Sequence, residues 1–259
     1  MKLVVLVKYV PESSAAWSFA DDLTLDRENI EGRLSELDEY AAEQAVRLAG
    51  SNAPVEISYL TMGPARAVDG LRKALAMGGE RAVHVLDDAI HGSDALATSL
   101  VLAEAIRRMG FDLVLSGMAS TDAEMAVVPV MVADRLGVPV LPNASALSVQ
   151  DGTVTVRRDF DDVVEELSAP LPALVSVTDR AGDPRYPSFK GIIAGKKKPV
   201  TTWSLADLEI AADRVGTGGA ATEVLAIRQR PPREAGTVIT DEGDAAARLA
   251  DFLAANKLL

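Results

Sequence analysis

The sequence predicts an α/β protein with a doubly wound, mostly parallel sheet, an antiparallel hairpin and a C-terminal extension. Three observations support this prediction. Short apolar runs alternate with segments of helical period as far as Pro142. The first run, residues 3–10, is continuous and rich in valine, which is typical of strands buried on both faces. After Pro142 the pattern changes to alternation of apolar and polar residues, which is typical of antiparallel strands.

The first strand and helix are well marked. The strand at residues 3–10 ends at Pro11, and a helix follows between Ser35, a preferred N-cap residue, and Gly50, a common stop. A buried strand followed by an amphipathic helix is the unit from which parallel sheets are built. The apolar positions of this helix recur at helical spacing, and they are Leu37, Tyr40, Ala41, Ala45 and Leu48.

Further strands and helices repeat this unit. Gly63 and Pro64 open the second helix, Ser93 caps the third, and a fourth over residues 121–137 is expected to kink at Pro129. Such alternation predicts a parallel sheet with helices on both faces. The strands are expected at residues 55–61, 81–87, 111–117 and 138–142.

Residues 143–203 complete the predicted domain. Alternation predicts a hairpin of residues 153–160 against residues 163–167, and residues 171–179 resemble one more central strand. We therefore expect a first domain over residues 1–203.

The extension, residues 204–259, has a different character. Its glycine-rich stretch "GTGGAA" is interpreted as a hinge. A terminal helix carries Leu249, Phe252 and Leu253 on one side. A tail with so little core of its own needs a surface to lie on.

The overall composition excludes several classes of protein. The formal net charge is −12, whereas a nucleic-acid-binding protein needs a broad basic face. No cysteine is present, which rules out disulfides and thiolate chemistry and fits a reducing compartment. The apolar runs are shorter than the roughly 20 residues of a spanning helix. We therefore expect no membrane insertion and a cytoplasmic protein.

The common catalytic motifs are missing from the sequence. Neither a P-loop, nor a dinucleotide glycine pattern, nor a nucleophile elbow is found. His84 lies within an apolar strand and is interpreted as structural, and His91 as a capping or surface residue, so no metal site is expected. The acidic pairs at residues 161–162 and 165–166 are interpreted as a solvated edge. Chemistry would then have to come from a bound cofactor.

The loops that follow the strands form the predicted binding region. In a doubly wound sheet the ligand lies beyond the carboxyl ends of the strands, where the strand order reverses. The loops there read "KYVPE", "TMGPA" and "SGMASTD", and two carry a glycine that would let a ligand approach the main chain. Free N–H groups at the following helix N-termini suit a phosphate.

One basic segment stands out in this acidic chain. Residues 185–198 hold five cationic side chains and no acid, yet they also carry Phe189, Ile192 and Ile193. Apolar residues beside charge are typical of a docking surface, whereas a flexible basic loop is the simpler interpretation. Composition alone leaves both open.

Several stretches together resemble one known family, the β subunits of electron transfer flavoproteins, also called FixA. They are "VKYVPE", "DEYAAEQAVRL", "GPARAVDGLRKALAMGGERAVHV", "DLVLSGMASTDAE", "LPALVSV" and "DPRYPSFKGIIAGKKK". They occur in this order, and the resemblance covers the whole length of the chain.

The resemblance implies an electron carrier subunit rather than an enzyme. It implies a heterodimer in which this chain forms a Rossmann-like base of the adenine-nucleotide-binding type. FAD would be held mainly by a mobile domain of the partner α subunit, and AMP, or in bifurcating members a second FAD, would lie in the crevice of this chain. Electrons would pass from dehydrogenases to a quinone oxidoreductase or another acceptor.

The resemblance also implies roles for particular residues. Residues 184–198 correspond to a recognition loop, in which Phe189 stands where an apolar anchor, often leucine, enters a pocket on the dehydrogenase. Residues 204–259 correspond to an arm that embraces the α subunit, and Asp159 aligns with an acidic position facing the flavin domain. The implied recognition residues are Arg185, Tyr186, Phe189, Lys190, Ile192 and Ile193. The implied nucleotide-binding residues are Val7, Lys8, Ser35, Glu36, Leu37, Asp38, Met62, Gly63, Gly117, Met118, Ala119, Ser120, Thr121 and Asp122.

The chain departs from the family after Asp122. Where the family commonly has polar residues that grip a phosphate, residues 123–128 read "AEMAVV". AMP, FAD and an empty crevice therefore remain open. The alternative function is a stand-alone adenine-nucleotide-binding protein of the stress-protein or ATP-pyrophosphatase type. It would need a phosphate-gripping loop after the first strand, which "KYVPESS" does not supply.

Overall fold

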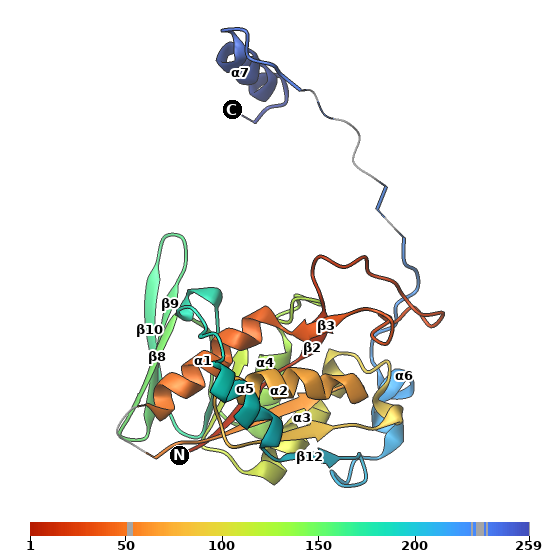
Figure 1. Cartoon of the computed structure of the whole chain (residues 1–259), viewed down its shortest axis with the longest axis vertical. Coiled ribbons are helices and arrows are strands. Elements are labelled where there is room, and N and C mark those ends of the chain that lie inside the picture. The colour runs from red at the N-terminus through yellow and green to blue at the C-terminus, as the bar shows by residue number, and fades with distance from the viewer. Residues whose placement is uncertain (51–53, 229, 232–235, 237, 259) are drawn as a thin grey trace. The chain divides into compact units, whose positions relative to one another are not determined.

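The computed structural model describes residues 1–50, 54–228, 230, 231, 236 and 238–258 (Figure 1). Within them, seven parallel strands form one sheet, in the order β12-β5-β4-β1-β6-β11-β7. The doubly wound parallel sheet predicted from the sequence is thus confirmed. The strands are β1 (Lys2–Leu6), β4 (Glu56–Met62), β5 (Arg81–Val85), β6 (Leu113–Gly117), β7 (Val140–Ala144), β11 (Ala173–Val177) and β12 (Val200–Trp203).

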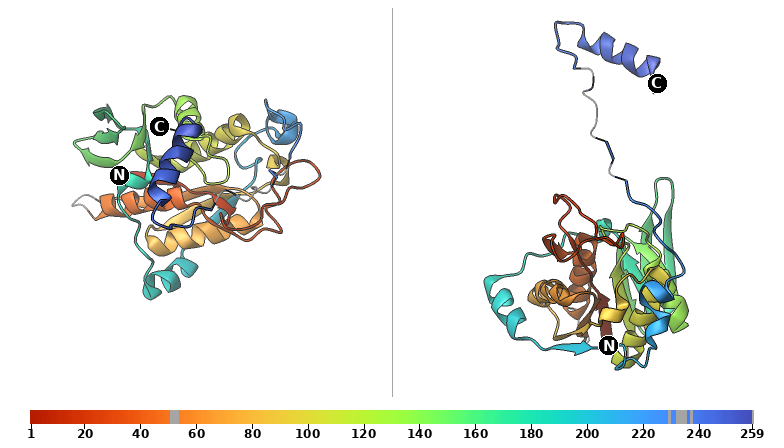
Figure 2. Two further views of the ribbon diagram at one scale, coloured as in Figure 1. Left: turned by 90° about the horizontal axis from the view of Figure 1, so that it is seen from above. Right: turned by 90° about the vertical axis from the view of Figure 1, so that its right-hand side faces the viewer.

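Helices cover both faces of this sheet (Figure 2). Helices α1 (Glu36–Ala49) and α2 (Val68–Met77) pack on one face, and α3 (Ala95–Met109) and α4 (Val128–Leu136) pack on the other. Alternate residues of β1 show why both faces are apolar, because Leu3 and Val5 enter the first core and Val4 and Leu6 enter the second. Ser35 and Gly50 flank α1 at the predicted positions, but the Ser35 side chain makes no capping hydrogen bond.

The predicted hairpin belongs to an antiparallel sheet with one more strand than expected. It consists of β8 (Ala146–Gln150), β9 (Thr153–Asp159) and β10 (Val164–Pro170), in the order β10-β9-β8. Val154 and Val156 of β9 are buried against the core on the α1 face of the parallel sheet. A short antiparallel pair, β2 (Tyr9–Pro11) and β3 (Gly32–Leu34), brackets the loop of residues 12–31.

Two helix predictions were wrong in detail. The fourth helix begins at Val128, not near residue 121, and Pro129 lies in its first turn, where its missing N–H costs nothing and no kink follows. Asp94, not Ser93, caps α3, because its carboxylate accepts the N–H of Ala97 at 2.9 Å.

The basic segment is more ordered than a loop. Ser188 caps helix α5 (Phe189–Lys197), accepting the N–H of Gly191 at 3.1 Å. The helix packs on α2, and the chain then adds β12 to the sheet edge beside β5. The part of the predicted recognition loop from Phe189 onward is therefore largely helical.

The chain after Trp203 divides at Leu225. The first compact unit, Met1–Leu225, includes Leu205, Leu208, Ile210 and Val215, which are buried in the second core. The predicted boundary at residues 203 and 204 thus lies within this unit. The predicted hinge contains the short helix α6 (Gly216–Gly219), and the N–H of Gly216 donates to the Ser93 hydroxyl at 2.8 Å. This glycine-rich stretch is packed because its residues leave room for that contact.

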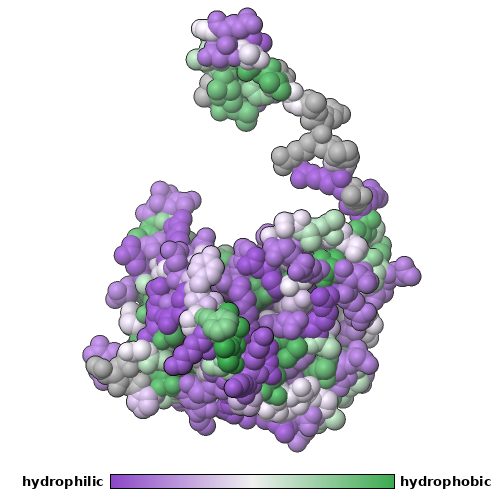
Figure 3. All heavy atoms as spheres, in the orientation of Figure 1, coloured by the Kyte–Doolittle hydropathy of each residue, from purple (hydrophilic) through white to green (hydrophobic). Residues whose placement is uncertain are grey.

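The second unit, Ala226–Leu259, carries helix α7 (Ala245–Ala255). Its described residues include no buried side chain, and Leu249 and Phe252 are exposed. Figure 3 shows apolar atoms gathered on one side of this helix and hydrophilic atoms on the other.

The close contact of α5 with α2 yields a stability prediction. A Cβ at Gly195 would lie 2.8 Å from the Ala76 main-chain nitrogen, so Gly195→Ala must push the helices apart. We expect a loss of about 1–3 kcal/mol in the free energy of unfolding, measured by urea denaturation. Gly218→Ala is the control, because a Cβ there meets nothing within 4 Å among the described residues. Equal stabilities for the two variants would contradict this packing.

Candidate functional site

The order of the strands reverses between β1 and β6. From β1 the chain proceeds to β4 and β5 on one side, and β6 then takes its place on the other side of β1. Ligands of doubly wound sheets bind beyond the carboxyl ends of the strands at such a switch point. The predicted nucleotide-binding residues follow β1, β4 and β6, three adjacent strands, or begin α1. The fold therefore gathers them at one edge of the sheet.

Asp38, in the first turn of α1, joins the ends of β1 and β6. One carboxylate oxygen accepts the N–H of Lys8 at 2.8 Å, and the other accepts the N–H of Gly117 at 3.2 Å. A Cβ at Gly117 would lie 2.7 Å from the Asp38 carboxylate and 2.8 Å from the Leu37 main chain. The glycine was expected to leave room for a ligand. In the structure, the contact its missing side chain permits is with the start of α1.

Burial dominates the ionisation of Asp38. The residue is only 6% exposed, and desolvation raises its pKa to about 7 despite the two N–H donors. The carboxyl group therefore changes charge close to neutral pH, next to the place where strands β1 and β6 end.

Two cations meet the carboxylate of Asp122 at the same place. Lys8 Nζ lies 2.8 Å from Asp122 Oδ1 and 3.2 Å from the Ser120 hydroxyl, and the Arg27 guanidinium binds Asp122 Oδ2. The Asp122 side chain is 1% exposed. Burial acts to raise its pKa, but Lys8 and Arg27 together hold it at about 2. The Asp122 carboxylate is therefore ionised at neutral pH, whereas burial lowers the pKa of Lys8.

Arg27 was missed by the sequence analysis. It lies in the loop of residues 12–31, which follows no strand of the parallel sheet, so the rule about strand ends passed over it. A signal was present, because Arg27 is the one basic residue between Lys8 and Arg33 and has acidic neighbours on both sides.

Buried hydroxyl groups at this edge of the sheet bear on whether it can bind a nucleotide. In the described part of the chain, the buried side-chain oxygens of Ser35, Thr61 and Ser116 have no hydrogen-bond partner. They stand just before α1, near the end of β4 and near the end of β6. The Tyr59 hydroxyl, within β4, is also buried and unpaired. Buried hydroxyls without partners are costly, and a bound water, ion or ligand is one explanation for them. The residues therefore fit a polar ligand that combines hydroxyl or ring-nitrogen groups with an anion.

The other predicted nucleotide-binding residues differ in their contacts. The Gly63 carbonyl contacts His84 Nε2 at 3.0 Å, which confirms His84 as a structural histidine. The N–H of Met118 donates to the Val177 carbonyl of β11 at 2.9 Å. Glu36 is exposed and pairs with Arg33 at 3.2 Å. Val7 is buried in the core on the α1 face, and Met62 packs against the core on the other face. Leu37, Ala119 and Thr121 are partly buried.

Residues 123–127, which depart from the family pattern, form a loop before α4. Glu124 and Ala126 have φ of +51° and +56°, the left-handed region that favours glycine. The N–H of Glu124 donates to the Ser120 carbonyl at 2.8 Å, and its side chain is exposed. The loop is thus built without glycine in a conformation that glycine adopts more readily.

The predicted recognition residues form a rigid exposed surface. Arg185 makes a two-pronged ion pair with the buried carboxylate of Glu43, at 2.7 and 3.0 Å, and its N–H also donates to Glu43 at 3.1 Å. Tyr186 and Phe189 are 97% and 79% exposed, and Ile192 and Ile193 are about half as exposed as Phe189. Figure 3 shows an apolar patch over α5 with hydrophilic residues around it. Lys190 is also exposed, on the first turn of α5.

Asp159 belongs to the antiparallel sheet. It ends β9 on the antiparallel sheet and accepts the Arg157 Nε–H at 2.8 Å. Hydrogen bonds from Ser145 and Arg157 lower its pKa. Ser145 follows β7, and Arg180, whose charge also acts on Asp159, follows β11, so Asp159 lies near the carboxyl ends of these two strands. The contact of Asp159 with a flavin domain stays a prediction.

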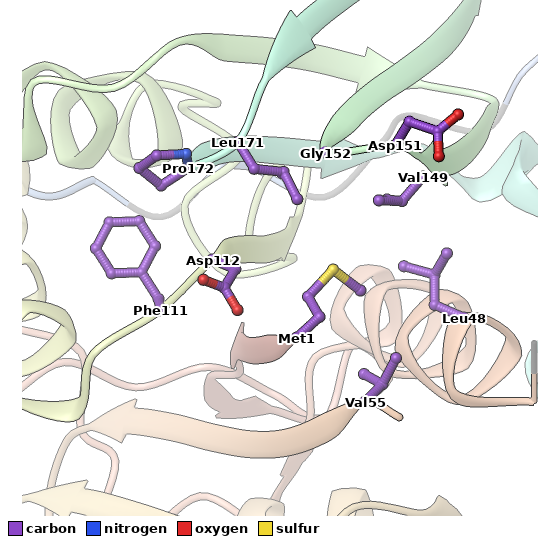
Figure 4. A pocket seen from close by; sticks show the side chains of 10 residues that line it. All are labelled: Met1, Leu48, Val55, Phe111, Asp112, Val149, Asp151, Gly152, Leu171 and Pro172. Atoms are coloured by element: carbon purple, nitrogen blue, oxygen red, sulfur yellow. The ribbon is translucent and has the colours of Figure 1, made fainter. Parts of the chain in front are cut away.

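A hollow of about 480 Å³ lies at the opposite edge of the sheet. Met1, Val55 and Asp112 stand just before or at the starts of β1, β4 and β6, and Figure 4 shows them among mostly apolar side chains. The Asp112 carboxylate already accepts the N–H of Lys2 at 2.6 Å. This arrangement offers no catalytic pair among the residues that line it.

The described residues lack two further features. None of their helices is long and apolar enough to cross a membrane. They contain no group of three or more histidine, cysteine or acidic side chains placed to hold a metal ion.

The fold and the switch-point residues define a Rossmann-like α/β chain with a separate C-terminal unit. Comparison with known proteins is specific. The family model of the electron transfer flavoprotein domain matches residues 22–208. The chain is 41% identical over 263 residues to an electron transfer flavoprotein subunit beta of Mycobacterium leprae, covering 99% of both chains. It is 32% identical to the caffeyl-CoA reductase-Etf complex subunit CarD of Acetobacterium woodii (93% and 92% covered) and 30% identical to a subunit beta of Megasphaera elsdenii (94% and 93%).

The chain therefore belongs to the electron transfer flavoprotein family, among its β subunits. It is an electron carrier subunit of a flavoprotein, as the resemblance implied, and the stand-alone nucleotide-binding protein is not favoured.

Asp38 gives a pH prediction. In the folded protein the Asp38 carboxyl group keeps its proton up to about pH 7, whereas in the unfolded chain it releases the proton near pH 3.8. The contribution of Asp38 to the free energy of unfolding therefore falls as the pH rises between these values. The stability of the natural protein relative to Asp38→Asn should fall by about 1.4 kcal/mol for each unit by which the pKa is raised. Urea denaturation from pH 4 to pH 8 measures it.

The exposed Glu36 supplies the control for this experiment. Glu36→Gln alters a carboxylate on the same turn of α1 that makes only a surface pair with Arg33. Its stability relative to the natural protein should stay level across this pH range. A level curve for Asp38→Asn as well would contradict a raised pKa at Asp38.

Proposed function

We propose that this subunit works in the cytoplasm as one half of a heterodimer with an electron transfer flavoprotein α subunit. The α subunit would hold the FAD that carries the electrons, since no residue pair described above can perform redox chemistry by itself. This chain would supply a base, an adenine-nucleotide site and a docking surface. Electrons would come from dehydrogenases and pass to a quinone oxidoreductase or another acceptor.

The exposed patch on α5 is the observation that carries the docking part of this proposal. A large apolar side chain such as Phe189, held on a capped helix and largely exposed, has no role within the described chain. Because Glu43 fixes Arg185 and α5 packs on α2, little conformational freedom would be lost on docking. A single apolar anchor on a helix that also carries lysines suits brief contacts with several dehydrogenases.

The proposed adenine-nucleotide site is based on the residues at the switch point. Lys8, Arg27, Ser120 and the unpaired hydroxyls lie at the edge where doubly wound sheets bind ligands. We propose AMP, or the AMP half of a second FAD, as the occupant. The ribose and base would meet the hydroxyl groups, and the phosphate would meet the cations.

Phe189 provides the test of docking. Phe189→Ala should lower the rate of flavin reduction by a dehydrogenase at limiting concentration by roughly tenfold or more, because a central aromatic anchor is lost, while flavin content stays the same. Stopped-flow absorbance measures this rate. Leu96→Ala removes another exposed apolar side chain, on α3, and should react normally. An unchanged rate for Phe189→Ala would show that α5 is not the docking surface.

The part of the arm that forms the second unit, Ala226–Leu259, provides the test of assembly. Co-expressed with its α subunit, the full chain should purify as a yellow heterodimer, whereas a chain ending at Leu225 should fold alone but fail to retain the α subunit. Size-exclusion chromatography, flavin absorbance and circular dichroism measure these properties. A colourless, self-associated full chain would instead favour the stand-alone nucleotide-binding protein, and a truncated chain that still forms the heterodimer would remove the role of the arm.

A further inference from the structure

The ion cluster at the switch point has an imbalance of charge. Asp122 is the shared carboxylate of Lys8 and Arg27, and among the described residues neither cation has a second carboxylate within ion-pair distance. The cations are also accessible from outside, since their side chains are 37% and 28% exposed while that of Asp122 is 1% exposed. The cluster thus presents two partly exposed cations over a buried anion.

The two cations come from separate parts of the chain. Lys8 follows β1 directly, and its main-chain N–H is fixed by Asp38. Arg27 comes from the loop of residues 12–31 and makes one further contact, with the Tyr9 carbonyl at 3.4 Å. The same loop has an independent attachment, because Arg66 donates to the Glu28 carbonyl at 2.8 Å. The Arg27–Asp122 pair is therefore not the sole attachment of this loop.

Any phosphate bound at this edge would lie close to these charges. A phosphate oxygen offers the same kind of acceptor as a carboxylate, and arginine binds both in the same two-pronged manner. An anion entering from outside would meet Lys8 and Arg27 before it met Asp122. Repulsion between the phosphate and Asp122 would then have to be relieved by a change of partner.

We propose that Arg27 is a phosphate-binding residue of the switch-point site and that Asp122 competes with the nucleotide phosphate for the Arg27–Lys8 pair. This inference deepens the proposed adenine-nucleotide site and rests on it. Asp122 then acts as an internal counterion that pairs with Lys8 and Arg27 when no phosphate is bound. A phosphate has to replace Asp122 in these ion pairs, so their strength lowers its affinity.

The test compares AMP with adenosine, which lacks the phosphate. Isothermal titration of the full-length chain, freed of small molecules on charcoal, gives the ratio of the two affinities. Arg27→Gln should lower this ratio about tenfold, because one charge-assisted hydrogen bond to phosphate is lost. Arg27→Lys should keep most of the natural ratio. Asp122→Asn should raise the ratio by a similar factor, because the competing charge is removed.

Arg66→Gln is the matched control. It removes an arginine that holds the same loop but does not contact Asp122, so the ratio should stay at the natural value. An equal fall in Arg66→Gln and Arg27→Gln would overturn the proposal, since loop attachment alone would explain it. A fall in Asp122→Asn would also overturn it, because Asp122 would then support phosphate binding instead of competing.

The outcomes separate this inference from the proposed function. If adenosine and AMP bind equally well to the natural chain and to every variant, the nucleotide site stands and the role of Arg27 fails. If neither ligand binds the natural chain at millimolar concentration, both fail. Should Asp122→Asn not fold, the comparison of Arg27→Gln, Arg27→Lys and Arg66→Gln still decides the question.

Discussion

One carboxylate joins the two strands between which the order of the sheet reverses. Asp38 accepts the N–H groups of Lys8 after β1 and Gly117 at the end of β6, so both are paired although the register of β1 with β6 ends at Val5 and Leu115. The bond to Lys8 fixes the main chain from which its ammonium group reaches Ser120 and Asp122, and the bond to Gly117 fixes the start of the loop that carries these two residues. The geometry of the whole switch-point site therefore depends on a buried side chain that would itself contact no phosphate.

Charged and apolar side chains are placed in opposite ways at the two proposed sites. At the switch point, Asp122 is buried beneath two cations and the cluster is held within the fold. On α5, apolar side chains are exposed, and buried polar contacts such as Glu43 with Arg185 hold them in place. Rigid placement has the same benefit in both regions, because a site that is already ordered loses less entropy when its ligand or partner binds.

Sequence patterns were sufficient for the parallel sheet because valine-rich runs and amphipathic helices each depend on local periodicity. They failed where a distant contact decides local structure. Residues 189–197 form a helix because their glycines fit against α2, and residues 121–127 do not, because the loop turns back on Ser120. The site followed the same division. Lys8 and Asp122 follow strands and could be predicted, whereas Arg27 reaches them from a loop whose path no local pattern fixes.

The claim that this β subunit holds an adenine nucleotide at the β1–β6 switch point has a direct test. The purified heterodimer would be denatured and its released small molecules identified and counted by mass spectrometry. A nucleotide at the switch point requires either one AMP beside one FAD, or two FAD, for each heterodimer. One FAD with no second adenine nucleotide would contradict it.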